Sequence, residues 1–98
     1  MVHVITRHKV ADYGQWKQVF DSHLNSRMAA GETGSRVFVS VDDPREVTVF
    51  SDWDSAEHAR RFLGSNDLKA AMKTAGVVGD PHISYVQDAV TIRRTSAD

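Results

Sequence analysis

The sequence predicts an α+β domain in which strands and helices follow one another in the order β-α-β-β-α-β. Three observations lead to this order. Short runs rich in β-branched and aromatic residues are typical of strands, and they recur along the chain. Helical periodicity fills the longer stretches between them. Capping and turn residues stand at the joints, so the elements can be assigned one after another.

The first strand and the first helix occupy the N-terminal third of the chain. Residues 2–9, VHVITRHK, predict the strand. Asp12 stands where an N-cap is expected, with Gln15 three residues on, and Gly31 is a natural helix stop. We therefore expect one continuous helix from Asp12 to about residue 30. At about 100° per residue, its apolar side carries Tyr13, Trp16, Val19, Phe20, Leu24 and Ala30.

The remaining elements form a hairpin, a helical segment and a last strand. Residues 35–41 and 46–53 predict two strands, and the short turn around Pro44 between them predicts an antiparallel hairpin. A capping box at 54–57 opens a helix that ends at Gly64, and a further helix spans about 66–74. Residues 76–81 are interpreted as a connection at the rim of a pocket. The last predicted strand covers residues 82–90, and residues 91–98 form a polar tail.

This order of elements is the split βαβ, or ferredoxin-like, arrangement. It predicts one domain, residues 1–90, with a four-stranded antiparallel sheet and both helical segments on one face. Apolar residues occur at both parities of the central strands, as in Val4 beside Ile5 and Val49 beside Phe50. A sheet that is apolar on both faces needs a second layer, and a second copy of the chain can supply it. We therefore predict a homodimer packed sheet to sheet.

Composition excludes several classes of protein. The 12 basic and 13 acidic residues give a net charge of −1, too small to attract nucleic acid or an anionic membrane. The sequence has no cysteine, which rules out disulfides, thiolate catalysis and iron–sulfur clusters. The N-terminus is too polar for a signal peptide, and no apolar run approaches the ~20 residues of a membrane span. These features favour a cytoplasmic protein.

The predicted arrangement, in a chain of 98 residues, resembles the dimeric α/β-barrel superfamily, and within it small proteins of the antibiotic-biosynthesis-monooxygenase type. The resemblance spans about residues 2–90 and is carried by RHKVADYGQWKQVFDSH, VTVFSDWDSAEHARRFL and KTAGVVGDP. It implies a pocket in each subunit between the helices and the sheet. It also implies a range of activities: cofactor-independent oxidation of aromatic polyketides, haem degradation, polyketide cyclisation and muconolactone isomerisation. Some similar proteins have no known activity.

His23 and Arg27 are the candidate catalytic residues, because helical spacing places both near the middle of the apolar side of the first helix. An Arg fork can hold a carboxylate, phenolate or enolate without losing its charge, and a His one turn away can move a proton near neutral pH. A structural interpretation stays open. Arg27 would then complement the helix dipole and reach water over its apolar stem, and His23 would be a boundary residue.

Candidate substrate-binding residues would form an apolar wall around this pair. They are Trp16, Phe20, Trp53, Phe62 and Met72, together with the hydroxyl of Tyr13 and with His8 at the mouth of the pocket. An ordinary core or strand-end role is the alternative for each. No two histidines have a metal-ligand spacing, so we predict neither metal nor cofactor. A haem ligand among His8, His23 and His58 stays open, without any spacing that selects one.

Our leading hypothesis is a small cofactor-independent enzyme that acts on an aromatic or enolisable small molecule, most like the monooxygenase branch. In it, Arg27 holds the anion, His23 moves the proton, and the aromatic residues pack the ring of the substrate. The alternatives are a polyketide cyclase or isomerase on the same fold, and a ligand-binding protein without turnover.

Overall fold

The chain, described by a computed structural model over residues 1–94, folds into one sheet and four helices. The elements in chain order are β1 (Val2–Val10), α1 (Tyr13–Ser22), α2 (Leu24–Ala30), β2 (Glu32–Val39), β3 (Glu46–Trp53), α3 (Ala56–Leu63), α4 (Asn66–Thr74) and β4 (Val77–Gln87).

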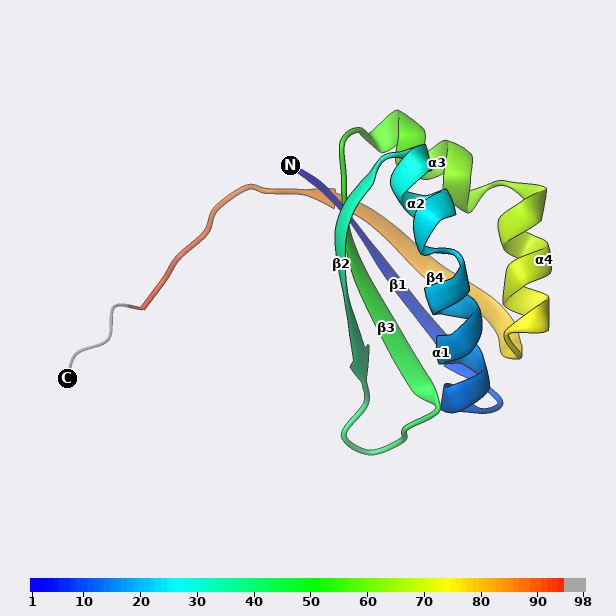
Figure 1. Cartoon of the computed structure of the whole chain (residues 1–98). Coiled ribbons are helices and arrows are strands. Elements are labelled where there is room, and N and C mark those ends of the chain that lie inside the picture. Colours follow the sequence, from blue (N-terminus) through cyan, green and yellow to red (C-terminus); the bar gives the residue numbers. More distant parts are fainter. Residues whose placement is uncertain (95–98) are drawn as a thin grey trace.

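The four strands form an antiparallel sheet in the order β2-β3-β1-β4, and the helices cover one face of it (Figure 1). Strand β1 lies in the centre, with β3 on one side and β4 on the other. This is the ferredoxin-like arrangement that the sequence predicts. No helix among residues 1–94 is long and apolar enough to cross a membrane.

The core lies between the sheet and the helices, in two clusters. Alternate positions of β1 and β3 point toward the helices and are buried, as strand geometry requires. One cluster gathers around Trp16 at one end of the sheet, and the other gathers around Trp53 at the other end. Asp12, Ser55 and Ser65 cap the helices that cover the clusters, each accepting a backbone N–H with its side chain.

The continuous first helix that the sequence predicts is wrong, because the helix breaks at His23. In an unbroken helix the Val19 carbonyl would accept the N–H of His23. Here it accepts the Ser22 hydroxyl at 2.7 Å and His23 Nδ1 at 2.9 Å instead, and the His23 N–H turns to the Phe20 carbonyl. Side chains that compete for backbone carbonyls in this way end helices. The new course of α2 leaves Leu24, predicted on the apolar side, exposed.

Two strand boundaries also differ from those predicted. Strand β2 covers Glu32–Val39, where 35–41 was expected. Strand β4 covers Val77–Gln87, where 82–90 was expected, so the predicted connection at 76–81 belongs mostly to the strand. A register shift against β1 falls in this stretch, and Gly79 there has a positive φ of 74°. A bulge on an edge strand accommodates both Gly79 and Pro81, whose presence hid the strand from the sequence pattern.

The chain leaves the body of the molecule after β4. Residues 88–94 have no regular secondary structure and extend away from the sheet on the side opposite the helices (Figure 1). They make up part of the predicted tail, 91–98, of which residues 95–98 lie outside the described part of the chain.

Candidate active site

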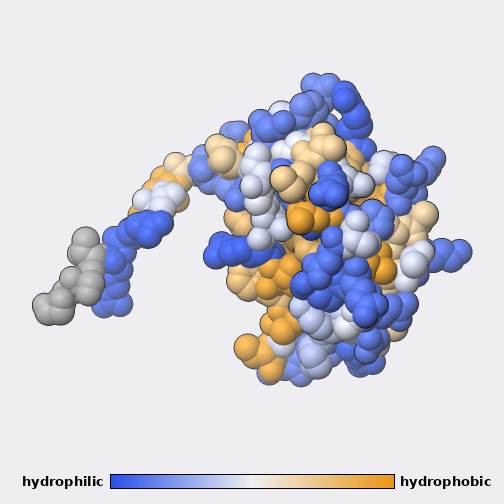
Figure 2. All heavy atoms as spheres, in the orientation of Figure 1, coloured by the Kyte–Doolittle hydropathy of each residue, from blue (hydrophilic) through white to orange (hydrophobic). Residues whose placement is uncertain are grey.

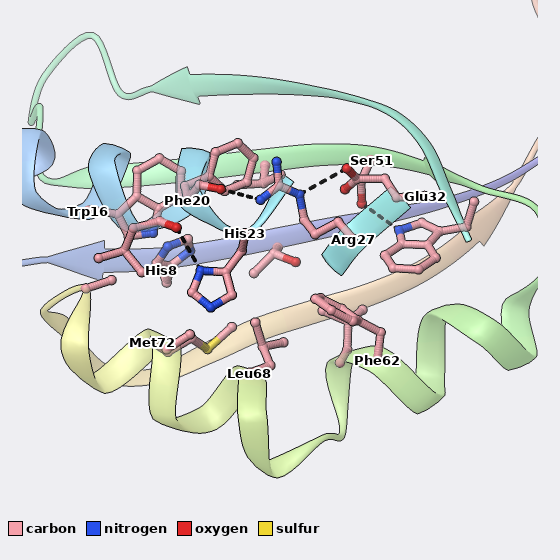
Figure 3. Close-up of a pocket in the computed structure, with 17 residues that line it drawn as sticks. His8, Trp16, Phe20, His23, Arg27, Glu32, Ser51, Phe62, Leu68 and Met72 are labelled. Carbon is pink, nitrogen blue, oxygen red and sulfur yellow. Dashed lines mark hydrogen bonds and ion pairs between the residues drawn. The ribbon is translucent and has the colours of Figure 1, made fainter. Parts of the chain in front are cut away.

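A cavity of about 90 Å³, partly open to the surface, lies between the sheet and the two helix pairs, and Figure 3 shows the residues that line it. Helices α1 and α2 form one wall and α3 and α4 form the opposite wall, with β1 and β3 as the floor. An engineered cavity of about 150 Å³ holds benzene, so a ligand with an aromatic ring would extend from this cavity toward the opening. The lining residues are Thr6, His8, Trp16, Val19, Phe20, His23, Arg27, Glu32, Val49, Ser51, Trp53, Phe62, Leu63, Leu68, Ala71, Met72 and Ala75.

The polar end of the cavity is built by a buried ion pair. Arg27 on α2 is 7% exposed and Glu32 at the start of β2 is 6% exposed. Arg27 Nε donates to Glu32 Oε2 at 3.0 Å, and Nη1 donates to the Phe20 carbonyl. The guanidinium lies 3.8 Å from the centre of the Phe20 ring. Arg27 therefore faces the cavity, and the alternative that its head reaches water is wrong.

Glu32 is a site residue that the sequence interpretation missed. Burial raises the pKa of its carboxyl, the hydrogen bond and charge of Arg27 pull in the opposite direction, and Asp52 adds to the rise. Because Glu32 pairs with Arg27, the guanidinium does not present an uncompensated positive charge to the cavity. The signal that could have found it is its place directly after the helix stop at Gly31, close to the end of the helix that carries Arg27.

His23 is held by its backbone neighbour in one tautomer. Its Nδ1 lies 2.9 Å from the Val19 carbonyl, and a carbonyl accepts only a protonated nitrogen. We therefore assign the proton of the neutral ring to Nδ1, which leaves the lone pair on Nε2. Figure 3 shows that this second nitrogen points across the cavity toward Met72 on α4. The helix break at His23 thus places Nε2, which has no hydrogen-bond partner within residues 1–94, on the wall of the cavity.

His8 reaches the cavity from the floor, on β1. Its ring lies 5.5 Å from the ring of Trp16, and its buried Nδ1 has no hydrogen-bond partner within residues 1–94. Burial lowers the pKa of the imidazole, so His8 is neutral near pH 7. A second imidazole, whose neutral form is favoured by burial, therefore lines the same space as His23.

Aromatic side chains line both ends of the cavity. Trp16 and Phe20 stack with ring centres 4.9 Å apart, while Trp53 and Phe62 meet at 5.6 Å in a tilted arrangement. The Trp53 indole N–H donates to the Ser51 hydroxyl at 2.9 Å. All four aromatic residues predicted for the wall are present, and Met72 joins them from α4.

Some predicted site residues lie elsewhere. Tyr13 packs beside Trp16, at a ring distance of 5.9 Å, but does not line the cavity. The stretch 76–81 does not line it either. His58 is exposed and pairs with Asp54. Among residues 1–94, no three His, Asp or Glu side chains come together in a group that could hold a metal ion.

The fold and this cavity define a small ferredoxin-like α+β protein with an internal, polar-ended site. The chain belongs to the antibiotic biosynthesis monooxygenase family, whose model matches residues 1–74. No curated protein matches it.

Solved structures share the fold at low sequence identity. SnoaB, a cofactor-independent oxygenase from Streptomyces nogalater, is 13% identical with a TM-score of 0.74, over 95% of this chain and 97% of that one. A Bordetella bronchiseptica protein named for the same family is 18% identical with a TM-score of 0.75, over 91% and 97%. A Caulobacter crescentus protein, also named for this family, is 23% identical with a TM-score of 0.70, over 92% and 90%. At these identities the likeness concerns the fold alone.

Proposed function

We propose that the protein is a cofactor-independent monooxygenase that takes an aromatic or enolisable small molecule into the cavity. The observation that carries the proposal is the hydrogen bond between His23 Nδ1 and the Val19 carbonyl, which leaves Nε2 of the neutral ring as the basic nitrogen on the cavity wall. A base in this position can take a proton from a phenol, an enol or an activated C–H group. Membership of the family and the likeness in fold to a cofactor-independent oxygenase support the same assignment.

The rest of the site suits the anion that this proton transfer forms. Trp16 and Phe20 offer stacked rings against which a flat substrate can pack. Arg27 lines the cavity, and those of its N–H groups that do not donate to Glu32 or to the Phe20 carbonyl are permanent hydrogen-bond donors for a phenolate or enolate oxygen. An electron-rich carbanion or phenolate can transfer an electron to molecular oxygen directly, which is the step that makes a flavin or metal unnecessary in this proposal.

The same proton transfer would also serve a cyclase or isomerase, because an enolate can attack a carbonyl within the same molecule. Oxygen consumption separates these reactions. Purified protein is mixed with a quinol-type aromatic substrate, and oxygen uptake is followed together with product formation. The proposal expects oxygen uptake in proportion to product. Product without oxygen uptake would indicate a cyclase or isomerase, and binding without product would indicate a ligand-binding protein.

His23→Ala tests whether the proposed base carries the reaction. We expect a loss of turnover of about 100-fold or more, the range typical of a general base, with ligand binding changed much less. Leu24→Ala is the matched control, since Leu24 is the next residue and is exposed. Unchanged turnover in a folded His23→Ala protein would overturn the role of His23.

We also propose that two copies of the chain pack through the open face of the sheet. Phe38, Phe50 and Val86 stand at positions of β2, β3 and β4 that point away from the helices, and Phe38 and Val86 are 46% and 39% exposed. The Arg36 guanidinium lies 5.4 Å from the ring centres of both Phe38 and Phe50. In the view of Figure 2, apolar and polar groups are interspersed over the surface of the molecule.

Light scattering after size exclusion tests this dimer. The proposal expects about twice the chain mass of 10.9 kDa for the native chain and the chain mass itself for Phe38→Asp. Val41→Asp is the control, because Val41 is 99% exposed in the β2–β3 turn and lies off this face. A native monomer would contradict the proposal. The cytoplasmic location stays a prediction.

A further inference from the structure

We propose that Glu32 makes the cavity selective for uncharged ligands by cancelling the charge of Arg27. The inference rests on the proposed function, in which the cavity takes a small aromatic molecule. Without Glu32, the same cavity would present a guanidinium beside aromatic rings, which is an arrangement suited to carboxylates. Glu32 thus decides which chemical class of aromatic molecule the site accepts.

The charge balance of the cavity carries this inference. Apart from its histidines, the lining has two ionisable side chains, Arg27 and Glu32, and they pair with each other at 3.0 Å. Both are buried, so little solvent screens the pair. A carboxylate ligand would bring a net negative charge into a mostly apolar space in which the guanidinium of Arg27 is already paired with Glu32. Such a charge is strongly disfavoured unless it is paired.

A phenol or an enol brings no net charge and fits the groups that remain. Its hydroxyl is a hydrogen-bond donor, and His23 offers an unprotonated Nε2 as the acceptor. Proton transfer from the hydroxyl to His23 then forms the anion inside the site, with the imidazolium beside it. The total charge of the cavity stays the same during this proton transfer, whereas the binding of a ligand that is already an anion would change it.

The Phe20 carbonyl also helps to hold the Arg27–Glu32 pair in place. Arg27 Nη1 donates to this carbonyl while Nε donates to Glu32, so two hydrogen bonds set the plane of the guanidinium. The stacking of the guanidinium on the Phe20 ring, at 3.8 Å, holds it from a third side. Arg27 therefore cannot turn away from Glu32 to meet an incoming carboxylate without losing several contacts together.

Glu32→Gln tests the inference with two probes of matched size, phenol and benzoate. Gln keeps the shape of Glu and can still accept from Arg27 through its amide oxygen, but it carries no charge. The native protein should bind phenol and bind benzoate at least tenfold more weakly at pH 7.5, by calorimetry or ligand-detected NMR. The variant should gain at least tenfold in benzoate affinity, with phenol affinity changed about twofold or less. Glu46→Gln is the matched control, since Glu46 is exposed and does not line the cavity.

The reciprocal variant keeps the test decisive if Glu32→Gln does not fold. Arg27→Gln leaves Glu32 as the uncompensated charge, so it should gain at least tenfold in affinity for benzylamine, the cationic probe, and none for benzoate. Circular dichroism establishes that each variant is folded before binding is measured.

The outcomes separate this inference from the function on which it rests. Unchanged benzoate affinity in a folded Glu32→Gln protein that still binds phenol would overturn the role of Glu32 and leave the site standing. Equal binding of phenol and benzoate by the native protein would do the same. Binding of none of the probes by the native protein and its variants would overturn the cavity as a ligand site, and both proposals with it.

Discussion

Two ionic clusters lie on opposite faces of the sheet, and they use similar groups in different surroundings. Under the helices, Arg27 and Glu32 pair in the wall of the cavity, with side chains 9% and 3% exposed. On the open face, His3 lies between Asp52 and Asp88, with each ring nitrogen 2.6 Å from a carboxylate oxygen. The two carboxylates there are 38% and 56% exposed.

The pKa of the carboxyl group is shifted in opposite directions in the two clusters, for Glu32 and for Asp88. Burial raises the pKa of Glu32 even though a guanidinium donates to it. On the open face, the hydrogen bond between His3 and Asp88 lowers the pKa of Asp88 and raises the pKa of His3. Both nitrogens of His3 face carboxylate oxygens, an arrangement that favours the doubly protonated imidazolium. Close to water, pairing with an opposite charge sets the charge state of a group. In the interior of the fold, desolvation opposes the charged form.

Charge stabilises the fold in the His3 cluster, whereas in the buried pair it serves the site. The His3 cluster joins β1, β3 and the residue after β4, and Asp88 also lies 3.8 Å from the N-terminal amine. That cluster holds strand ends together. The buried pair joins α2 only to the adjoining strand β2, and burying two charges costs desolvation free energy. Its main role is therefore in the charge balance of the cavity.

Arg27→Met should give the largest loss of stability, because it leaves Glu32 buried without a partner. We expect the free energy of unfolding to fall by about 3–5 kcal/mol at pH 7, measured by urea denaturation. The double variant Arg27→Met with Glu32→Leu removes both charges and should lose much less than the single variant. Equal losses in the single and double variants would mean that packing around Arg27, and not its charge, stabilises the region.

The sequence predicted the cavity wall better than it predicted the pair. Helical spacing places Trp16, Phe20 and Arg27 on the side of the first helix that faces the sheet, and that periodicity survives in the structure. Glu32 lies beyond the helix stop, where no periodicity applies. Its contact with Arg27 depends on how the chain turns from α2 into β2, which is a tertiary feature.

The break at His23 was missed for a different reason. Periodicity and capping patterns describe a helix by its faces and its ends. The break arises because Ser22 and His23 compete for the Val19 carbonyl, and no spacing rule reports such competition. The start of β4 was missed because Gly79 and Pro81 are turn residues in most settings, and here a bulge accommodates them.

His3→Gln should lower the free energy of unfolding by a smaller amount, and this loss should depend on pH. The folded-state pKa of His3 is raised above its ordinary value of 6.5, so its contribution is fully present below pH 6.5 and is lost as the pH rises through the folded-state pKa. At pH 6 we expect the variant to lose about 1 kcal/mol or less, since the partners are partly exposed. The difference between the two proteins should shrink as the pH rises above 6.5 toward 9. A difference that is constant from pH 6 to pH 9 would mean that His3 acts through packing on Phe50, whose ring lies 5.0 Å away.

Lys17→Ala should change the free energy of unfolding least. It provides the reference value for an exposed ion pair, against which the losses from the two clusters can be compared. Lys17 Nζ lies 2.7 Å from Asp21 Oδ2 one turn along α1, and both side chains reach solvent, at 39% and 57% exposure. Exposed pairs of this spacing contribute about 0.3–0.5 kcal/mol, and a Lys placed before its acid is the weaker orientation. Alanine also favours the helix, so the net loss in urea denaturation should lie within about 0.5 kcal/mol of zero. A loss as large as that of His3→Gln would show that α1 depends on its surface charges, and the contrast between burial and exposure would then no longer explain the ranking.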